Sequence, residues 1–86
     1  MATINRLEDL EVWKESKKLA LAIYSHFRPL KDFGFRDQIC RASVSVMNNI
    51  AEGFERNSDK EFQRFLSISK GSLGEVRSMI ILAIDL

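Results

Sequence analysis

The stretch QICRASVSVMNNIAE, residues Gln38 to Glu52, decides how this chain folds. On a helix with about 3.6 residues per turn, its side chains fall into two apolar stripes separated by one polar line. The apolar stripes hold Ile39, Ala42, Val46 and Ile50, and Cys40, Val44, Met47 and Ala51. The polar line holds Arg41, Ser45, Asn49 and Glu52. A helix that is apolar on nearly all sides is usually buried, so this segment predicts a central helix in a multi-helix core.

The polar line needs partners if its helix is central. A buried donor or acceptor without a partner costs roughly 1–3 kcal/mol, so we expect these side chains to form a hydrogen-bonded network. Arg41 is a fixed cation with five donors, and Glu75 is a candidate partner for it. Such a network would fix helix register or subunit packing. Contact with a ligand or with nucleic acid is the alternative role for the polar line.

Length and composition limit the class of protein. With 86 residues there is room for one domain, residues 1–86, which is marginally stable alone. Cys40 is the only cysteine, so no internal disulfide can form and oligomerisation is the expected further source of stability. A lone cysteine on an apolar stripe favours a reducing compartment. No signal peptide or membrane-spanning run is recognisable, so the sequence predicts a soluble cytoplasmic protein with no membrane partner.

Hydrophobic spacing predicts an all-α chain, and the family resemblance described below implies that its helices form an antiparallel up-down bundle. Three helices are expected and no strand, at about residues 7–28, 35–54 and 59–86. Pro29 ends the first helix, and the stretch 30–34 is a short connection. Gly53 is the expected terminator of the second helix. Ser58 and Glu61 fit a capping box that begins the third.

The third helix is apolar on two sides. Beside its main stripe it carries a second apolar patch, formed by Ile68, Met79, Leu82 and Leu86. Gly71 and Gly74 each cost about 1 kcal/mol relative to alanine, so we expect them to pack closely against a neighbour. A helix with two apolar sides needs two neighbours. The sequence therefore predicts that a fourth helix is missing at the C-terminus, or that another subunit covers this patch as an oligomer surface.

Two segments carry a family resemblance: DLEVWKESKKLALAIY at 9–24 and FGFRDQICRASVSVMNNIAEGFERNSDKEFQRFLSISKGSLGEV at 33–76. The strongest part is a spaced pattern of Gln38, Ile39, Arg41, Ala42, Ser45 and residues 49–53. These segments resemble the bacterial four-helix-bundle family known as 23S rRNA intervening-sequence proteins. The resemblance implies an up-down bundle assembled as a homopentamer, with RNA as the leading ligand. It also extends to the accessory variability protein of diversity-generating retroelements, which binds nucleic acid and a reverse transcriptase.

The chain departs from the family pattern at three places. Cys40 stands where a second arginine is common, which removes a positive charge. Met47 stands where proline is frequent, so the second helix is expected to be straighter. The chain also stops where the family continues into a fourth helix.

Basic residues give the candidate nucleic-acid contacts. The net charge is only +1, which is no strong signal for a polyanion. Arg56, Lys60 and Arg64 are the best candidates for a phosphate-binding cluster, because Lys60 and Arg64 lie one turn apart. Acidic residues are interleaved with them, so a mixed soluble surface is the alternative.

Catalytic chemistry is not indicated. His26 is the only histidine, no metal-ligand spacing exists, and the GSLG at 71–74 is not a phosphate-binding loop. We predict no catalytic residue, no cofactor and no metal. The preferred function is a non-enzymatic, self-associating bundle that binds RNA. The alternative is a protein-partner adaptor that docks a reverse transcriptase.

Overall fold

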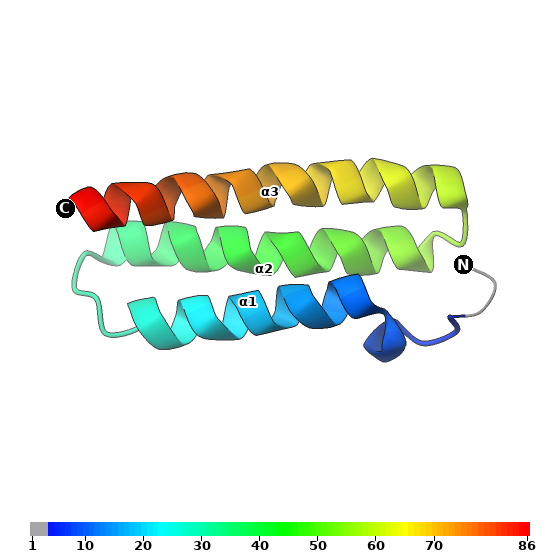
Figure 1. Cartoon of the computed structure of the whole chain (residues 1–86), viewed down its shortest axis with the longest axis horizontal. Coiled ribbons are helices and arrows are strands. Elements are labelled where there is room, and N and C mark those ends of the chain that lie inside the picture. The colour runs from blue at the N-terminus through cyan, green and yellow to red at the C-terminus, as the bar shows by residue number, and fades with distance from the viewer. Residues whose placement is uncertain (1–3) are drawn as a thin grey trace.

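Three antiparallel α-helices make up nearly all of the computed structural model, which describes residues 4–86 (Figure 1). The elements are a short 3-10 turn η1 (Leu7–Asp9), α1 (Glu11–Phe27), α2 (Phe33–Glu55) and α3 (Asp59–Asp85). Helix α2 packs against both α1 and α3. The prediction of an all-α chain with three up-down helices is confirmed, and residues 4–86 contain no strand.

The first two helices begin at places that the sequence pattern does not mark. Residues 7–9 form a 3-10 turn, and Leu10 has extended backbone angles (φ −81°, ψ 115°), so α1 begins only at Glu11. Helix α2 begins earlier than predicted, because the Asp32 side chain accepts a hydrogen bond from the Phe35 N–H (3.2 Å) and caps it. Gly34 therefore lies in the first turn of α2 and not in the connection.

The end of α2 also differs from the prediction. The helix continues through Gly53 to Glu55, so the prediction that Gly53 terminates it is wrong. The chain instead reverses at Asn57, the one non-glycine residue within 4–86 with a positive φ (56°). Asparagine tolerates this left-handed conformation better than most residues. Helix α3 then begins after Ser58, whose Oγ accepts the Glu61 N–H (3.4 Å).

Gly53 allows the first turns of α3 to approach α2. A Cβ added at Gly53 would lie 2.7 Å from Phe65 Cβ and 3.3 Å from Phe62 Cα. Gly71 and Gly74 have no atom within 4 Å of such a Cβ, so the predicted close packing of these two glycines is wrong within residues 4–86. Close packing is therefore the role of Gly53.

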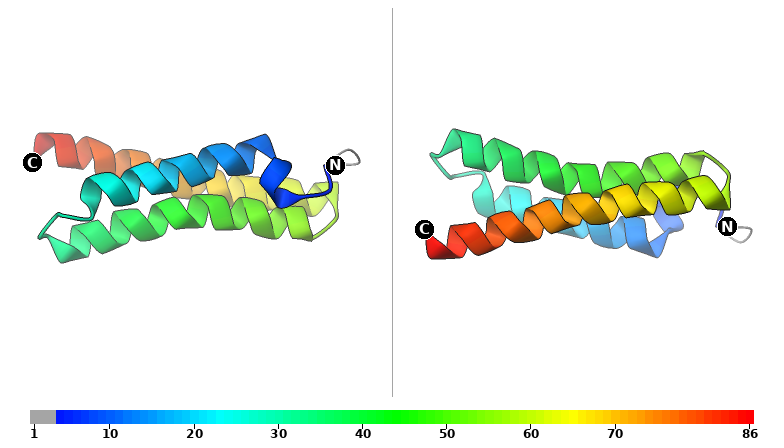
Figure 2. Two further views of the ribbon diagram at one scale, coloured as in Figure 1. Left: turned by 90° about the horizontal axis from the view of Figure 1, so that it is seen from below. Right: turned by 90° about the horizontal axis from the view of Figure 1, so that it is seen from above.

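The core forms around α2, as predicted for the central helix. Its fully buried side chains include Ile39 and Ile50 from α2 and Val76 from α3. Burial of an isoleucine or valine stabilises the fold by roughly 1.5–3 kcal/mol each. Viewed along the two directions of Figure 2, α1 and α3 both lie on the same side of α2. The three helices thus form an open arrangement, with α2 at its corner.

Candidate functional site

The middle of the polar line is hydrogen-bonded across the α2–α3 contact. The hydroxyls of Ser45 on α2 and Ser72 on α3 lie 2.9 Å apart. The Asn49 amide donates to the Ser45 carbonyl (2.9 Å) and to the Ser45 Oγ (3.1 Å). One turn deeper in the contact, the buried Ser69 hydroxyl donates to the Val46 carbonyl (2.7 Å). The Ser45–Ser72 and Ser69–Val46 bonds cross between the two helices and fix their register, and the Asn49 bonds lie within α2.

The two ends of the polar line face solvent. Glu52 is exposed and pairs with Arg56 on the same helix (3.2 Å). Arg41 is also exposed, and within residues 4–86 it has no hydrogen bond or ion pair. Glu75 accepts a hydrogen bond from Gln38 instead (3.4 Å), so the predicted pairing of Arg41 with Glu75 is not formed. Arg41 is therefore free to meet an external anion.

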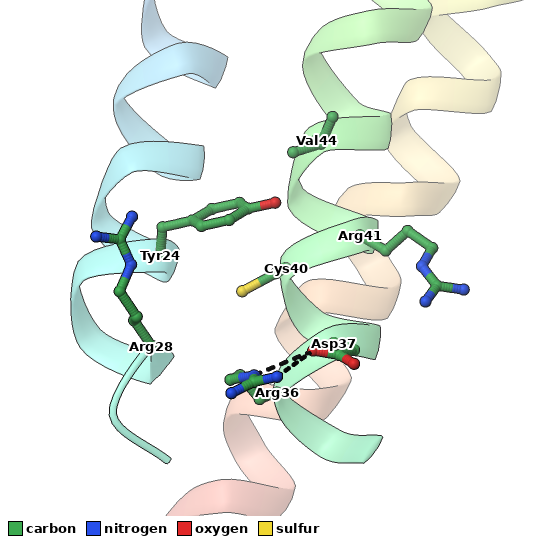
Figure 3. Close-up of a pocket in the computed structure, with 7 residues that line it drawn as sticks. All are labelled: Tyr24, Arg28, Arg36, Asp37, Cys40, Arg41 and Val44. Atoms are coloured by element: carbon green, nitrogen blue, oxygen red, sulfur yellow. Dashed lines mark hydrogen bonds and ion pairs between the residues drawn. The ribbon is translucent and has the colours of Figure 1, made fainter. Parts of the chain in front are cut away.

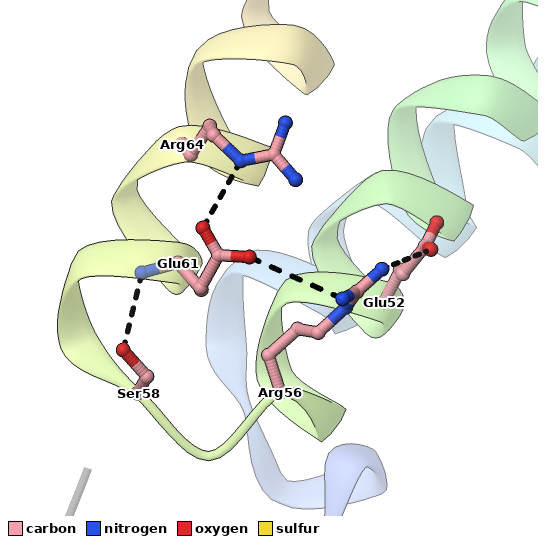
Figure 4. Close-up of polar contacts among 5 residues, drawn as sticks. All are labelled: Glu52, Arg56, Ser58, Glu61 and Arg64. Carbon is pink, nitrogen blue, oxygen red and sulfur yellow. Dashed lines mark hydrogen bonds and ion pairs between the residues drawn. The ribbon is translucent and has the colours of Figure 1, made fainter.

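The predicted basic cluster lies at the turn between α2 and α3 and is largely paired with acids (Figure 4). Arg56 contacts Glu52 (3.2 Å) and Glu61 (4.0 Å), and Arg64 donates to Glu61 (3.1 Å). Glu61 therefore binds these arginines and does not complete the capping box. The guanidinium groups of Arg56 and Arg64 also stack on the Phe65 ring, at 5.2 and 4.6 Å from its centre.

Lys60 adds one positive charge to that segment but does not make it basic. It is exposed, and no carboxylate within residues 4–86 pairs with it. Residues 52–64 contain three basic and four acidic side chains, a formal charge of −1. The structure therefore brings Arg56, Lys60 and Arg64 together but does not concentrate positive charge there.

An apolar groove runs between α1 and α3, with α2 as its floor. One section has a volume of about 330 Å³ and includes Val12 and Leu19 from α1, Ile50 from α2, and Leu66 and Leu73 from α3. A second section shares Leu19 and continues along the same two helices to Ile84. Leu73 keeps 45% of its surface exposed. The open arrangement of the helices thus leaves one side of the core uncovered.

The predicted apolar patch of α3 contains both exposed side chains and one buried side chain. Ile68, Leu82 and Leu86 are exposed, at 43%, 50% and 87%, and we call them the outer flank. Met79 is only 8% exposed and belongs to the core, so its inclusion in an oligomer surface is wrong. Met79 belongs to the buried core cluster, and the other three side chains lie outside it.

A basic pocket at the α1–α2 contact was missed in reasoning from the sequence (Figure 3). Its volume is about 460 Å³, and it is lined by Tyr24 of α1, by Arg28 directly after α1, and by Arg36, Asp37, Cys40 and Arg41 of α2. These residues come shortly before and shortly after the turn that joins α1 to α2. Two antiparallel helices joined by a short turn bring such residues together, so their positions in the sequence were the signal from which the pocket could have been predicted.

Cys40 lies in the wall of this pocket. It is a buried free thiol, and burial raises its pKa. The nearby Arg28 and Arg36 oppose this rise in pKa but do not overcome it. A neutral thiol is a poor nucleophile, so the position of Cys40 indicates packing.

No three histidine, cysteine or acidic residues within 4–86 lie together in a way that would hold a metal ion. None of the helices in the same range is long and apolar enough to cross a bilayer.

Comparison with known proteins gives one match. Residues 8–86 match the family model described as 23S rRNA-intervening sequence protein. No curated protein and no solved structure matches the chain. The matched range includes all three helices, the polar line and the basic pocket. The chain therefore belongs to the 23S rRNA-intervening sequence protein family.

Proposed function

We propose that this protein is a non-enzymatic, RNA-binding protein that works as an assembly of several copies of itself. The observation that carries the proposal is the apolar groove between α1 and α3. Leu73 and Val12 are each more than two-fifths exposed in it, and further apolar side chains line its length. An 86-residue chain has little stability to spare, so covering this groove would add stabilisation that the isolated helices lack.

The rim of the groove supports a second copy as its cover. Glu15 lies on the α1 wall and Lys70 on the α3 wall of the same section. A ring of copies whose axis is parallel to the helices would place the α1 wall of each copy beside the α3 wall of the next, and so each Glu15 beside a Lys70. Such charge complementarity sets the orientation of an interface more than its strength. Five copies, the number implied by the family resemblance, are the expected stoichiometry.

RNA is the proposed ligand for two reasons. The family description names the 23S rRNA intervening sequence, and the α1–α2 contact carries arginines without carboxylate partners. Binding through phosphates would make the affinity fall steeply with salt. A cytoplasmic location belongs to the same proposal, because a buried free thiol such as Cys40 suits a reducing compartment.

Self-association is tested by two matched variants analysed by sedimentation velocity. Leu73→Glu places a charge in the groove, where assembly would bury it. Leu21→Glu is the control, because Leu21 is 61% exposed and lies about 200° around α1 from the groove residue Leu19. We expect Leu73→Glu to dissociate the assembly while Leu21→Glu leaves it intact. Equal sedimentation of both variants and the wild type would refute the groove as the interface.

The alternative function is an adaptor for a reverse transcriptase. The observation in its favour is the outer flank, which is apolar and faces away from the groove. The double variant Ile68→Glu/Leu82→Glu should then abolish binding to a purified reverse transcriptase while assembly and RNA binding persist. Undiminished binding by the double variant would exclude this surface as the docking site.

A further inference from the structure

The two ends of the bundle differ in charge. Residues 28–41, at the α1–α2 turn, contain four basic and two acidic side chains, a formal charge of +2. Residues 52–64, at the opposite end, have a formal charge of −1. A polyanion is therefore attracted to the α1–α2 end in preference to the end that holds Arg56, Lys60 and Arg64.

The arginines at the α1–α2 end are also more available. Arg28 and Arg41 are exposed and have no carboxylate partner within residues 4–86. Arg36 pairs with its neighbour Asp37 through Nη2 and Nε, both 3.0 Å from the same carboxylate oxygen. Asp32 is occupied as the cap of α2. The guanidinium groups of Arg28 and Arg41 thus have all their N–H donors available for phosphate oxygens. The guanidinium group of Arg36 has some of its donors engaged by Asp37.

Exposed aromatic rings lie beside these arginines. Phe33, at the first position of α2, is 60% exposed, and the Arg36 guanidinium lies 4.6 Å from its ring centre. Tyr24 is 38% exposed and extends from α1 towards α2 (Figure 3). Exposed rings next to cations are the combination on which unpaired bases stack.

The arginines do not converge on one point. In Figure 3, Arg28 lies along the end of α1 and Arg36 extends from α2 on the side that faces α1, whereas Arg41 extends from the other side of α2. One phosphate group cannot reach all three, but successive phosphates of a strand that crosses the start of α2 can. Glu75 lines the cavity on the other side of Arg41 and would repel a strand that continued onto α3.

We propose that the corner formed by Arg28, Arg36 and Arg41 with Tyr24 and Phe33 is a binding site for single-stranded RNA. The arginines contact consecutive phosphates, and the two rings stack on bases. This inference rests on the proposed RNA-binding function and assigns its site to this corner.

The test is fluorescence anisotropy of the wild-type protein with a labelled single-stranded oligouridylate, over about 50 to 200 mM salt. Arg28→Gln and Arg36→Gln should each weaken binding by about tenfold. Each should also reduce the slope of log affinity against log salt by about 0.7, the value for one phosphate contact to a single strand. Arg64→Gln is the matched control at the opposite end and should bind as the wild type does.

The ring contacts and the ligand class have separate readouts. Phe33→Leu should weaken binding by about fivefold or more without changing the salt slope, because a stacked base carries no phosphate contact. Inorganic phosphate at the same ionic strength should not displace the oligouridylate. Stoichiometric displacement by phosphate would show a single-anion site and overturn the proposal, as would tighter binding to a duplex of equal length.

Failure of the site and failure of the proposed function give different results. If the wild type binds oligouridylate and Arg28→Gln and Arg36→Gln bind equally well, the corner is wrong while RNA binding stands. Loss of binding only in Arg64→Gln would reassign the site to the opposite end. If the wild type binds no RNA at low salt, both the proposed ligand and this site are wrong.

Discussion

Replacing Gly53 with alanine should destabilise the protein, although the same change in most helices stabilises it. Alanine is favoured over glycine in a helix interior by about 0.8–1.0 kcal/mol. At Gly53, however, the new methyl group would lie 2.7 Å from Phe65 Cβ and 3.2 Å from Phe62 Cδ1. Carbon atoms prefer separations of about 3.5–4.0 Å, so the start of α3 would have to move away from α2.

The size of the effect follows from which atoms can move. Phe65 Cβ and Phe62 Cα are fixed to the α3 backbone, so a change of rotamer cannot relieve the contact. Overpacking of a core typically costs 1–3 kcal/mol, and here it opposes a helix gain of about 1 kcal/mol. The difference is a fall in the free energy of unfolding of about 0–2 kcal/mol, and we expect the upper half of that range because Phe65 Cβ and Phe62 Cα move only with the α3 backbone.

Gly71 and Gly74 are the matched controls, because both lie in α3 with open space around them. Gly71→Ala and Gly74→Ala should each raise the free energy of unfolding by about 0.5–1 kcal/mol. The assay is urea unfolding followed by circular dichroism, at one protomer concentration for all variants. If Gly53→Ala is stabilised as the other two are, the close approach of α2 and α3 at this glycine is refuted.

Predictions at three positions, Ser69, Asn57 and Cys40, test other parts of the fold. Ser69→Ala removes the buried bond to the Val46 carbonyl and should lower the free energy of unfolding by about 1 kcal/mol, which chemical denaturation measures. Asn57→Ala should cost about 1 kcal/mol and Asn57→Gly almost nothing, because position 57 has a φ of 56°; thermal unfolding would separate them. Cys40 should react with a maleimide only under unfolding conditions, and reaction in the native state at neutral pH would contradict its burial. Because the pKa of Cys40 is raised on folding, its contribution to stability is complete below the unfolded pKa and decreases as the pH rises above about 8.5. Cys40→Ala should therefore lose less stability than the wild type over that rise in pH, and equal losses would show that the thiol does not titrate differently on folding.

The central place of α2 could be predicted because its pattern is local. The stripe that includes Ile39 and Val46 recurs at helical spacing and is buried, so the core face of α2 follows from the sequence alone. On the second stripe only Cys40 is buried, and Val44, Met47 and Ala51 are half-buried. The hydrogen bond between Ser45 and Ser72 could be predicted only in part. The need of Ser45 for a partner is local, but the identity of that partner depends on the register between two helices.

Features that depend on how far one helix covers another could not be predicted. Met79 and Leu82 lie in the same predicted patch, yet only Met79 is buried in the core. Spacing also cannot distinguish a glycine that ends a helix from one that admits a neighbouring helix, which is why Gly53 was assigned wrongly. The basic pocket combines Arg28 and Arg36 across a turn, so it becomes visible only once the antiparallel packing of α1 and α2 is known.

Native mass spectrometry of the wild-type chain at micromolar concentration tests the central claim most directly. The claim is that copies of this chain cover one another's groove between α1 and α3. It predicts a mass that is a multiple of one chain, five being the expected number, and a return to monomers for Leu73→Glu. A wild-type chain that is monomeric at this concentration and still unfolds cooperatively would contradict it.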